Sequence, residues 1–194
     1  VSSENAVFLE GRCLSYSRGV AFYPIIDILK ANFDIRENDG DLEIREKIQK
    51  GIQIVNADEA STLPYLLELL SVKDSGVDRI SLSPEARKDR IIKTIIRITI
   101  KASEIRSLII AIEDLHWIDK SSEDVFKSLL ESIPGAPVLL IFTYRPEFVV
   151  AEKLEAMVAL GDINTRLKDY YDLLRMNRTM ALPREDLIEA LRAT

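Results

Sequence analysis

The feature that most constrains this chain is residues 108–119, which read LIIAIEDLHWID. Five apolar residues precede two adjacent carboxylates, Glu113 and Asp114. An apolar run of this length that ends in acids is typical of a parallel strand buried on both faces. Such a strand carries its acids to the carboxyl edge of the sheet, where open α/β sheets bind ligands. The sequence therefore predicts an α/β fold with a site at this edge.

Two readings of the paired acids stay open on chemistry alone. Like charges disfavour each other's ionisation, so burying two adjacent carboxylates without a cation is unfavourable. A bound metal ion is one remedy, and exposure to solvent is the other. Glu113 and Asp114 are therefore either a catalytic pair or the solvated exit of a strand.

The rest of the chain supplies more strands and several helices. We expect a short strand at residues 7–9 and a second buried strand starting at Val138, followed by Thr143 and Arg145. Helical spacing of apolar residues predicts the helices. They are expected at residues 23–33, 42–55, 63–70 and 84–105, then from Ser121 or Ser122 to residue 130. The expected caps are Ser61 or Thr62 for the third helix and Ser83, ahead of Pro84, for the fourth. This order matches part of a doubly wound parallel sheet.

Composition narrows the classes of function. The net charge of −6 argues against a nucleic-acid-binding face, and no apolar run approaches the roughly 18 residues that would suggest a membrane span. The single cysteine, Cys13, gives no disulfide framework and fits a reducing, cytoplasmic compartment. His116 is the sole histidine, which excludes a histidine-based metal cluster. The chain begins at Val1 rather than at Met, as a fragment would.

Three segments resemble one family of ATPases. EDLHW followed by Asp119, Ser121 and Ser122 resembles the EDLHWxDxSS signature of signalling ATPases in the STAND branch of the AAA-related NTPases. These include ATPase regions fused to bacterial adenylate or guanylate cyclases and to transcriptional regulators. Residues 7–28 resemble the strand and loop after that family's phosphate-loop helix, and residues 138–148 resemble its sensor strand.

The resemblance implies a role for each residue at the sheet edge. Glu113 would hold the Mg²⁺ shell, and Asp114, also near the metal through water, would polarise the attacking water. Arg145 would sense the γ-phosphate of ATP, with Thr143 beside the nucleotide. The alternative for Arg145 is an ordinary strand-end cation paired with Glu113 or Asp114. The cofactor implied for the complete parent protein is Mg²⁺ with ATP.

One part of that machinery is missing from the sequence. No GxxxxGK[ST] phosphate loop occurs in the 194 residues. That loop supplies backbone N–H groups, a lysine and a hydroxyl to the triphosphate and the metal, and its charge-assisted contacts dominate binding. We therefore expect a partial P-loop NTPase-like sheet flanked by helices over residues 1–148, which by itself neither binds ATP tightly nor hydrolyses it.

The last part of the chain resembles a different family. Residues 149–194 are similar to the carboxyl-terminal part of AbiEii-type nucleotidyltransferase toxins, in which Lys153 and Asp169 would match nucleotide-contacting residues. The Gly-Ser and DxD segment that such enzymes need for catalytic metal is absent, so we expect no transfer chemistry. Amphipathic helices at residues 149–160, 166–174 and from Pro183 predict an all-helical segment, and its alternative role is simply to pack on the sheet.

The prediction is therefore a fragment of an ATP-binding and ATP-hydrolysing signalling NTPase, joined near residue 148 to a helical segment. A nucleotidyltransferase toxin remnant and a noncatalytic protein-interaction module are the alternatives. The partners expected are ATP and the other domains of a multidomain signalling protein, and neither nucleic acid nor a membrane.

Overall fold

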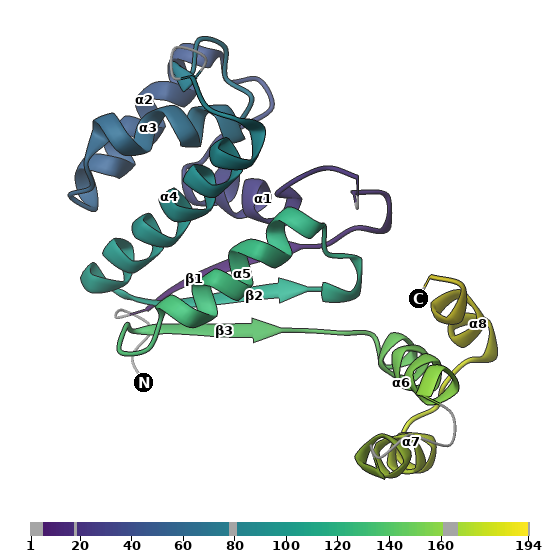
Figure 1. Cartoon of the computed structure of the whole chain (residues 1–194). Coiled ribbons are helices and arrows are strands. Elements are labelled where there is room, and N and C mark those ends of the chain that lie inside the picture. Colours follow the sequence, from purple (N-terminus) through teal and green to yellow (C-terminus); the bar gives the residue numbers. More distant parts are fainter. Residues whose placement is uncertain (1–5, 18, 78–80, 161–166, 194) are drawn as a thin grey trace. The chain divides into compact units, whose positions relative to one another are not determined.

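A computed structural model describes residues 6–17, 19–77, 81–160 and 167–193 of the chain (Figure 1). The chain divides into two compact units, Val1–Phe142 and Thr143–Thr194. The helices described in both units are too short or too polar to cross a membrane.

The first unit is built on a parallel sheet. Its strands are β1 (Ala6–Arg12), β2 (Ser107–Glu113) and β3 (Val138–Phe142), in the spatial order β1-β2-β3. The register pairs Phe8 with Ile109 and Ile109 with Leu139. The predicted α/β class with a parallel sheet is therefore confirmed, although β1 continues to Arg12 instead of ending at residue 9.

Five α-helices connect these strands in the described part of the unit. They are α1 (Tyr23–Asn32), α2 (Asp41–Ile54), α3 (Glu59–Leu69) and α4 (Pro84–Ile105) before β2, and α5 (Lys120–Ser132) before β3. The predicted start of α4 is confirmed, because Ser83 Oγ accepts a hydrogen bond from the Ala86 N–H at 3.2 Å and Pro84 occupies the first turn.

Two helix starts differ from the prediction. Helix α3 begins after Asp58, whose carboxylate accepts the Ser61 N–H at 2.9 Å, so Ser61 lies inside the first turn. Helix α5 begins after Asp119 rather than at Ser121 or Ser122. In both cases an aspartate ahead of a serine is the cap, and its negative charge is also favoured by the helix dipole at the N-terminus.

Helices α1, α4 and α5 all pack on one face of the sheet. The strands follow one another in a single direction across the sheet, and right-handed crossovers in a single direction place every connecting helix on the same side. Alternate strand residues on this side, such as Leu108 and Ile112, are buried in the core. Gly11 permits the approach of α1, because a Cβ there would lie 2.8 Å from the Pro24 carbonyl oxygen.

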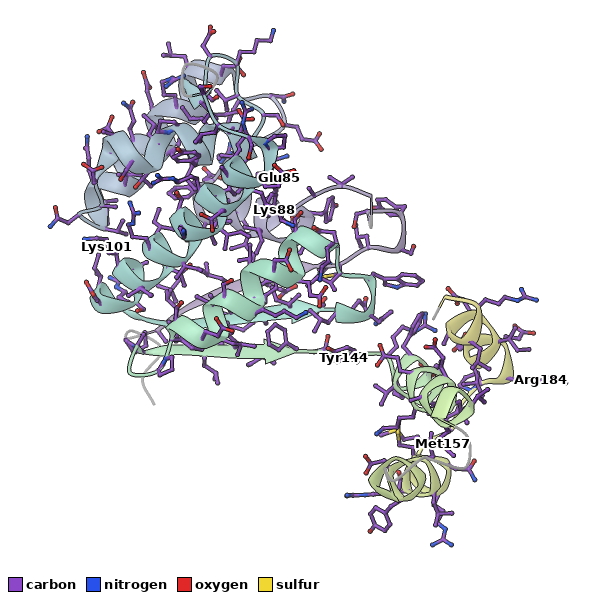
Figure 2. The ribbon with its side chains drawn as sticks, viewed as in Figure 1. Glu85, Lys88, Lys101, Tyr144, Met157 and Arg184 are labelled. Atoms are coloured by element: carbon purple, nitrogen blue, oxygen red, sulfur yellow. The ribbon has the colours of Figure 1, made fainter. Side chains whose placement is uncertain are left out.

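Polar contacts from α4 hold its neighbours in place. Lys88, labelled in Figure 2, forms an ion pair with Asp124 of α5 at 2.8 Å. Lys101 donates a hydrogen bond to the Asn56 carbonyl between α2 and α3 at 2.8 Å. These lysines of the long helix therefore have partners inside the first unit.

The opposite face of the sheet carries exposed apolar side chains. Phe8 is 57% exposed, Leu139 is 54% exposed and Ile141 is 40% exposed. In the paired strands these residues occupy the positions that alternate with those covered by helices, so their side chains lie on the other face. The sheet described here is therefore covered by helices on one side, whereas a doubly wound sheet is covered on both.

The second unit is helical, as predicted. It contains α6 (Pro146–Leu160), α7 (Leu167–Thr179) and α8 (Arg184–Ala193). Phe148 and Ala151 of α6 and Ala190 of α8 are buried, and Lys153 forms an ion pair with Asp172 of α7 at 3.0 Å. Helix α6 runs through residue 148 without interruption.

Candidate functional site

The candidate site lies where β1 and β2 end. Glu113 is the last residue of β2, and the register places it beside Arg12, the last residue of β1. Arg12 Nε is 3.0 Å from Glu113 Oε2, and Arg12 Nη2 is 2.8 Å from Glu10 Oε1. The hydrogen bond that Arg12 donates to Glu10, followed by the charge of Glu113, raises the pKa of the Arg12 guanidinium. Arg12 therefore pairs with both Glu10 and Glu113 at the edge of the sheet, and all three side chains are partly exposed to solvent.

Asp114 follows directly and has an unusual backbone. Its φ of 54° and ψ of 45° lie in the left-handed region. Aspartate is one of the few residues with a side chain that visits this region routinely. The conformation ends β2 abruptly, and the Asp114 carbonyl accepts the Trp117 N–H at 2.9 Å to start a 3₁₀ turn, Leu115–Trp117. Asp114 is therefore the residue at which the chain turns from β2 into the 3₁₀ turn.

Asp119 closes the loop behind the acids and is 4% exposed. Its carboxylate oxygens accept the N–H groups of Ser121 and Ser122 at 3.0 Å each and the Ser122 hydroxyl at 2.6 Å, which caps α5. They also accept the N–H groups of Phe22 at 2.9 Å and Tyr23 at 3.2 Å, at the start of α1. The negative charge is thus satisfied by five donors at two helix N-termini, where the macrodipoles favour an anion.

Cys13 and His116, which follow the ends of β1 and β2 in the chain, are both buried. The Cys13 N–H donates to the Glu113 carbonyl at 3.0 Å, and its side chain is 1% exposed. Burial, with the charges of Asp119 and Asp114, raises the pKa of the Cys13 thiol to about 12. His116 is 7% exposed, and its ring centroid is 5.2 Å from that of Trp117. A thiol with so high a pKa is not a nucleophile near neutral pH.

The remaining predicted site residues, Thr143 and Arg145, belong to the second unit. Arg145 lies among acids of that unit, with nitrogen–oxygen distances of 3.7 Å to Glu147, 3.5 Å to Asp186 and 3.9 Å to Glu189. Its guanidinium carbon is also 5.7 Å from the Phe148 ring centroid. These contacts give Arg145 a role in joining α6 to α8. The pairing of Arg145 with Glu113 or Asp114 stays a prediction, whereas Arg12 is a cation that does pair with Glu113.

Lys153 and Asp169, for which the sequence predicts nucleotide contacts, lie in the second unit. Lys153 of α6 is bound to Asp172 of α7, so its ammonium joins two helices. The side chain of Asp169 lies outside the described residues. The described part of the chain contains no group of three histidine, cysteine or acidic side chains arranged to hold a metal ion.

A scan against protein-family models matches the AAA ATPase domain over residues 1–141. The match ends one residue before the first unit does. The chain belongs to the AAA ATPase family. No curated protein and no solved structure matches it.

Two residues of the AAA ATPase domain, Arg12 and Asp119, make contacts at the site that the sequence alone does not indicate. Arg12 pairs with Glu113, but the predicted strand ends at residue 9, and the partner of Arg12 depends on a register that spans a hundred residues of sequence. Asp119 belongs to the EDLHWxDxSS-like signature, which gives it no role of its own. Its spacing ahead of two serines and a helix predicts a cap, but its contact with α1 is tertiary.

Proposed function

We propose that Glu113 and Asp114 are the nucleotide-site acids of an ATP-hydrolysing AAA domain. Glu113 would hold the hydration shell of Mg²⁺, and Asp114 would accept a proton from, or polarise, the attacking water. The observation that carries this proposal is the position of the pair: an apolar strand of an AAA ATPase domain ends at two carboxylates on the carboxyl edge of its sheet. Phosphoryl transfer by this family of folds relies on such positioning and on electrostatics.

The chemistry of the donors suits magnesium. Mg²⁺ prefers oxygen ligands and keeps several waters, so it is bound through one or two carboxylates and the substrate phosphates rather than by a complete protein cage. Glu113 has a side chain that is 44% exposed, which leaves room for a hydrated ion. Arg12 would then be shared between Glu10 and the site, and it would hold Glu113 in place before the ion arrives.

The sheet supports a specific place for the missing phosphate loop. A strand that precedes β1 in sequence could pair with the free edge of β3. Its connection to β1 would then cross the sheet in the direction opposite to the connections from β1 to β2 and from β2 to β3. Because such connections are right-handed, the helix in this one would lie on the bare face that holds Phe8, Leu139 and Ile141. The reversal would also create a switch point at the carboxyl edge, the kind of place where α/β sheets bind ligands. We infer that a strand–loop–helix unit from outside these 194 residues packs there.

The role of Arg145 as the γ-phosphate sensor, with Thr143 beside the nucleotide, stays part of the proposal. The three acids near Arg145 lie at 3.5 Å or more from it, so these ion pairs are loose. Exchange of such contacts for a phosphate would cost little, because partly exposed pairs contribute only about 0–1 kcal/mol each.

The finer family assignment rests on the sequence signature. The EDLHWxDxSS string favours the STAND branch, and with it a cytoplasmic signalling protein whose other domains are partners. The resemblance of residues 149–194 to nucleotidyltransferase toxins would make the second unit a remnant without transfer activity.

The test is Mg-ATP binding measured by isothermal titration calorimetry. The 194-residue chain alone should show no measurable heat of binding. The same chain preceded by an AAA strand–loop–helix segment with GxxxxGK[ST] should bind Mg-ATP at micromolar concentration. A matched extension in which the loop lysine is alanine should not. Micromolar binding by the unextended chain, or none by the extended chain with a folded spectrum, would overturn the proposal.

A further inference from the structure

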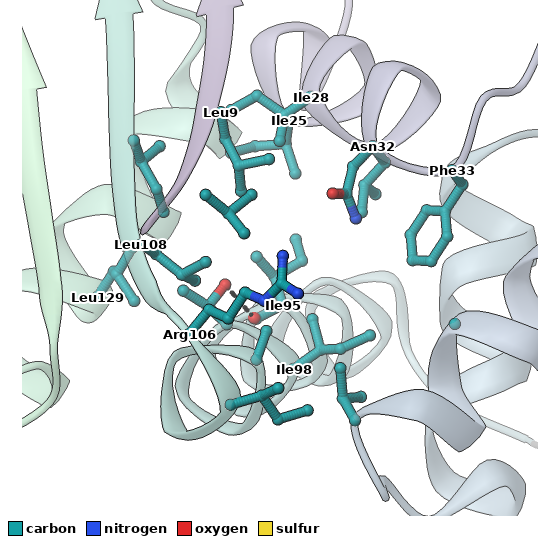
Figure 3. A pocket seen from close by; sticks show the side chains of 18 of the residues that line it. Leu9, Ile25, Ile28, Asn32, Phe33, Ile95, Ile98, Arg106, Leu108 and Leu129 are labelled. Carbon is teal, nitrogen blue, oxygen red and sulfur yellow. Dashed lines mark hydrogen bonds between the residues drawn. The ribbon is translucent and has the colours of Figure 1, made fainter. Parts of the chain in front are cut away.

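A second concave site lies on the helix-covered side of the sheet, at the end remote from the acids. It is a cavity of about 430 Å³ between β1, β2, α1, α2, α4 and α5 (Figure 3). Val7 and Leu108, near the beginnings of their strands, contribute to it, whereas Glu113 ends its strand. The cavity is therefore separate from the candidate nucleotide site.

The wall of this cavity is apolar. Its lining includes Ile28, Leu29, Ile95, Ile98, Ile110 and Leu129. The hydroxyl of Thr99, which also lines it, donates to the Ile95 carbonyl at 2.8 Å and so is satisfied within α4. Protein interiors rarely contain voids larger than a water molecule, and an apolar void stays dry and accepts apolar molecules.

The opening is marked by exposed lining residues. Ile54 is 64% exposed and Ile105 is 54% exposed, and Arg106 beside them is exposed as well. Figure 3 shows the side chains of Arg106 and Asn32 directed into the space that the apolar side chains enclose. Among the described residues, no carboxylate pairs with the Arg106 guanidinium. The rim therefore combines a cation and an amide with an apolar interior.

We propose that this cavity binds a small apolar monocarboxylate, with the hydrocarbon chain inside and the carboxylate on Arg106 and Asn32. Three observations select this ligand class. The volume falls in the range of about 300–1,000 Å³ that is usual for small-molecule pockets. The interior offers dispersion contacts to a chain but hardly any hydrogen bonds. The guanidinium is a fork of donors that fits a carboxylate with two hydrogen bonds, and the Asn32 amide adds a further donor.

The experiment follows octanoate binding to the 194-residue chain by amide NMR, with 1-octanol as the uncharged counterpart. Octanoate should bind with a dissociation constant of the order of 0.1–1 mM and shift amides around Thr99 and Arg106. Ala102→Leu, which fills the cavity from α4, should weaken octanoate binding at least tenfold without lowering the unfolding temperature. Arg106→Gln should weaken octanoate about tenfold and leave 1-octanol unchanged.

Matched controls separate this site from others. Arg90→Gln removes an exposed arginine of α4, the helix that ends just before Arg106. Phe8→Ser changes the bare face of the sheet. Both variants should bind octanoate as the native chain does. Thr99→Leu replaces Ala102→Leu if that variant does not fold. Absence of saturable shifts up to about 5 mM octanoate overturns the proposal. Octanoate binding that Arg106→Gln leaves unchanged, or octanoate binding that only Phe8→Ser abolishes, also overturns it.

Discussion

Asp119 shows how a signature residue can serve the site without touching the ligand. Its carboxylate receives five hydrogen bonds from the starts of α5 and α1, and so it fixes the loop that follows the acids. The sequence signature includes Asp119, but residue spacing alone does not indicate that α1 is its second partner. That contact exists only once β1 and β2 are paired.

Replacement of Asp119 should therefore destabilise the first unit. Asp119→Ala leaves four N–H groups without this acceptor, two of them buried and two partly buried, and we expect a loss of about 2–4 kcal/mol in the free energy of unfolding. Asp119→Asn keeps one acceptor oxygen and should lose less. Urea unfolding followed by circular dichroism measures both. Asp89→Ala, which removes an exposed carboxylate from α4, is the control; a change in Asp119→Ala no larger than in this control would contradict the assignment.

The left-handed backbone at Asp114 gives a second prediction at this scale. For alanine the left-handed conformation found at Asp114 costs roughly 1 kcal/mol, whereas glycine and asparagine adopt it readily. Asp114→Ala should thus be less stable than Asp114→Gly and Asp114→Asn by about 1 kcal/mol. Thermal unfolding of the three variants decides the order. Equal stability of the alanine variant would mean that the bend is not strained.

At the scale of elements, local signals predicted some features and missed others. The apolar run before Glu113 predicted β2, and Ser83 before Pro84 predicted the start of α4, because these signals lie within a few residues of each other. The caps at Asp58 and Asp119 were missed in favour of nearby serines. The run after Val138 predicted burial on both faces, yet Leu139 and Ile141 are exposed because every crossover in the described sheet runs the same way.

The ion pair between α4 and α5 should make their packing sensitive to acid. The hydrogen bond from Lys88, its main cause, lowers the pKa of the Asp124 carboxyl. A carboxyl with a lowered pKa contributes stability above its unfolded pKa of about 4, and that contribution is lost as pH falls through the lower folded value. The unfolding temperature of the native chain should exceed that of Asp124→Asn at pH 7, and the gap should close toward pH 3. A constant gap would contradict this origin.

For the whole molecule, the one-sided sheet is the main consequence of topology. Exposed edges and apolar faces of sheets promote association unless they are covered. We expect the 194-residue chain to self-associate with rising concentration in sedimentation velocity runs. The double change Leu139→Lys and Ile141→Lys should keep it monomeric. Leu42→Lys, at an isolated exposed leucine of α2, should not; monomeric native chain at all concentrations would argue against an uncovered face.

The candidate site could be predicted only in part. Glu113 and Asp114 are adjacent in sequence, so their common position at the sheet edge follows from the strand alone. The pairing of Arg12 with Glu113 depends on strand register, and the acids around Arg145 come from α6 and α8. Long-range partners of this kind are set by tertiary packing and leave no local pattern.

The most direct measurement compares Glu113→Gln, Asp114→Asn and Glu10→Gln in the chain extended by a phosphate-loop segment, with Mg-ATP binding and single-turnover hydrolysis recorded together. Glu10 is the matched control, because it contacts the same Arg12 as Glu113 does. We predict that Glu113→Gln weakens binding only when Mg²⁺ is present. Asp114→Asn should keep binding but lose about 10²–10⁴-fold in rate, and Glu10→Gln should change neither. Undiminished hydrolysis in Asp114→Asn and undiminished Mg²⁺ dependence in Glu113→Gln would contradict the account.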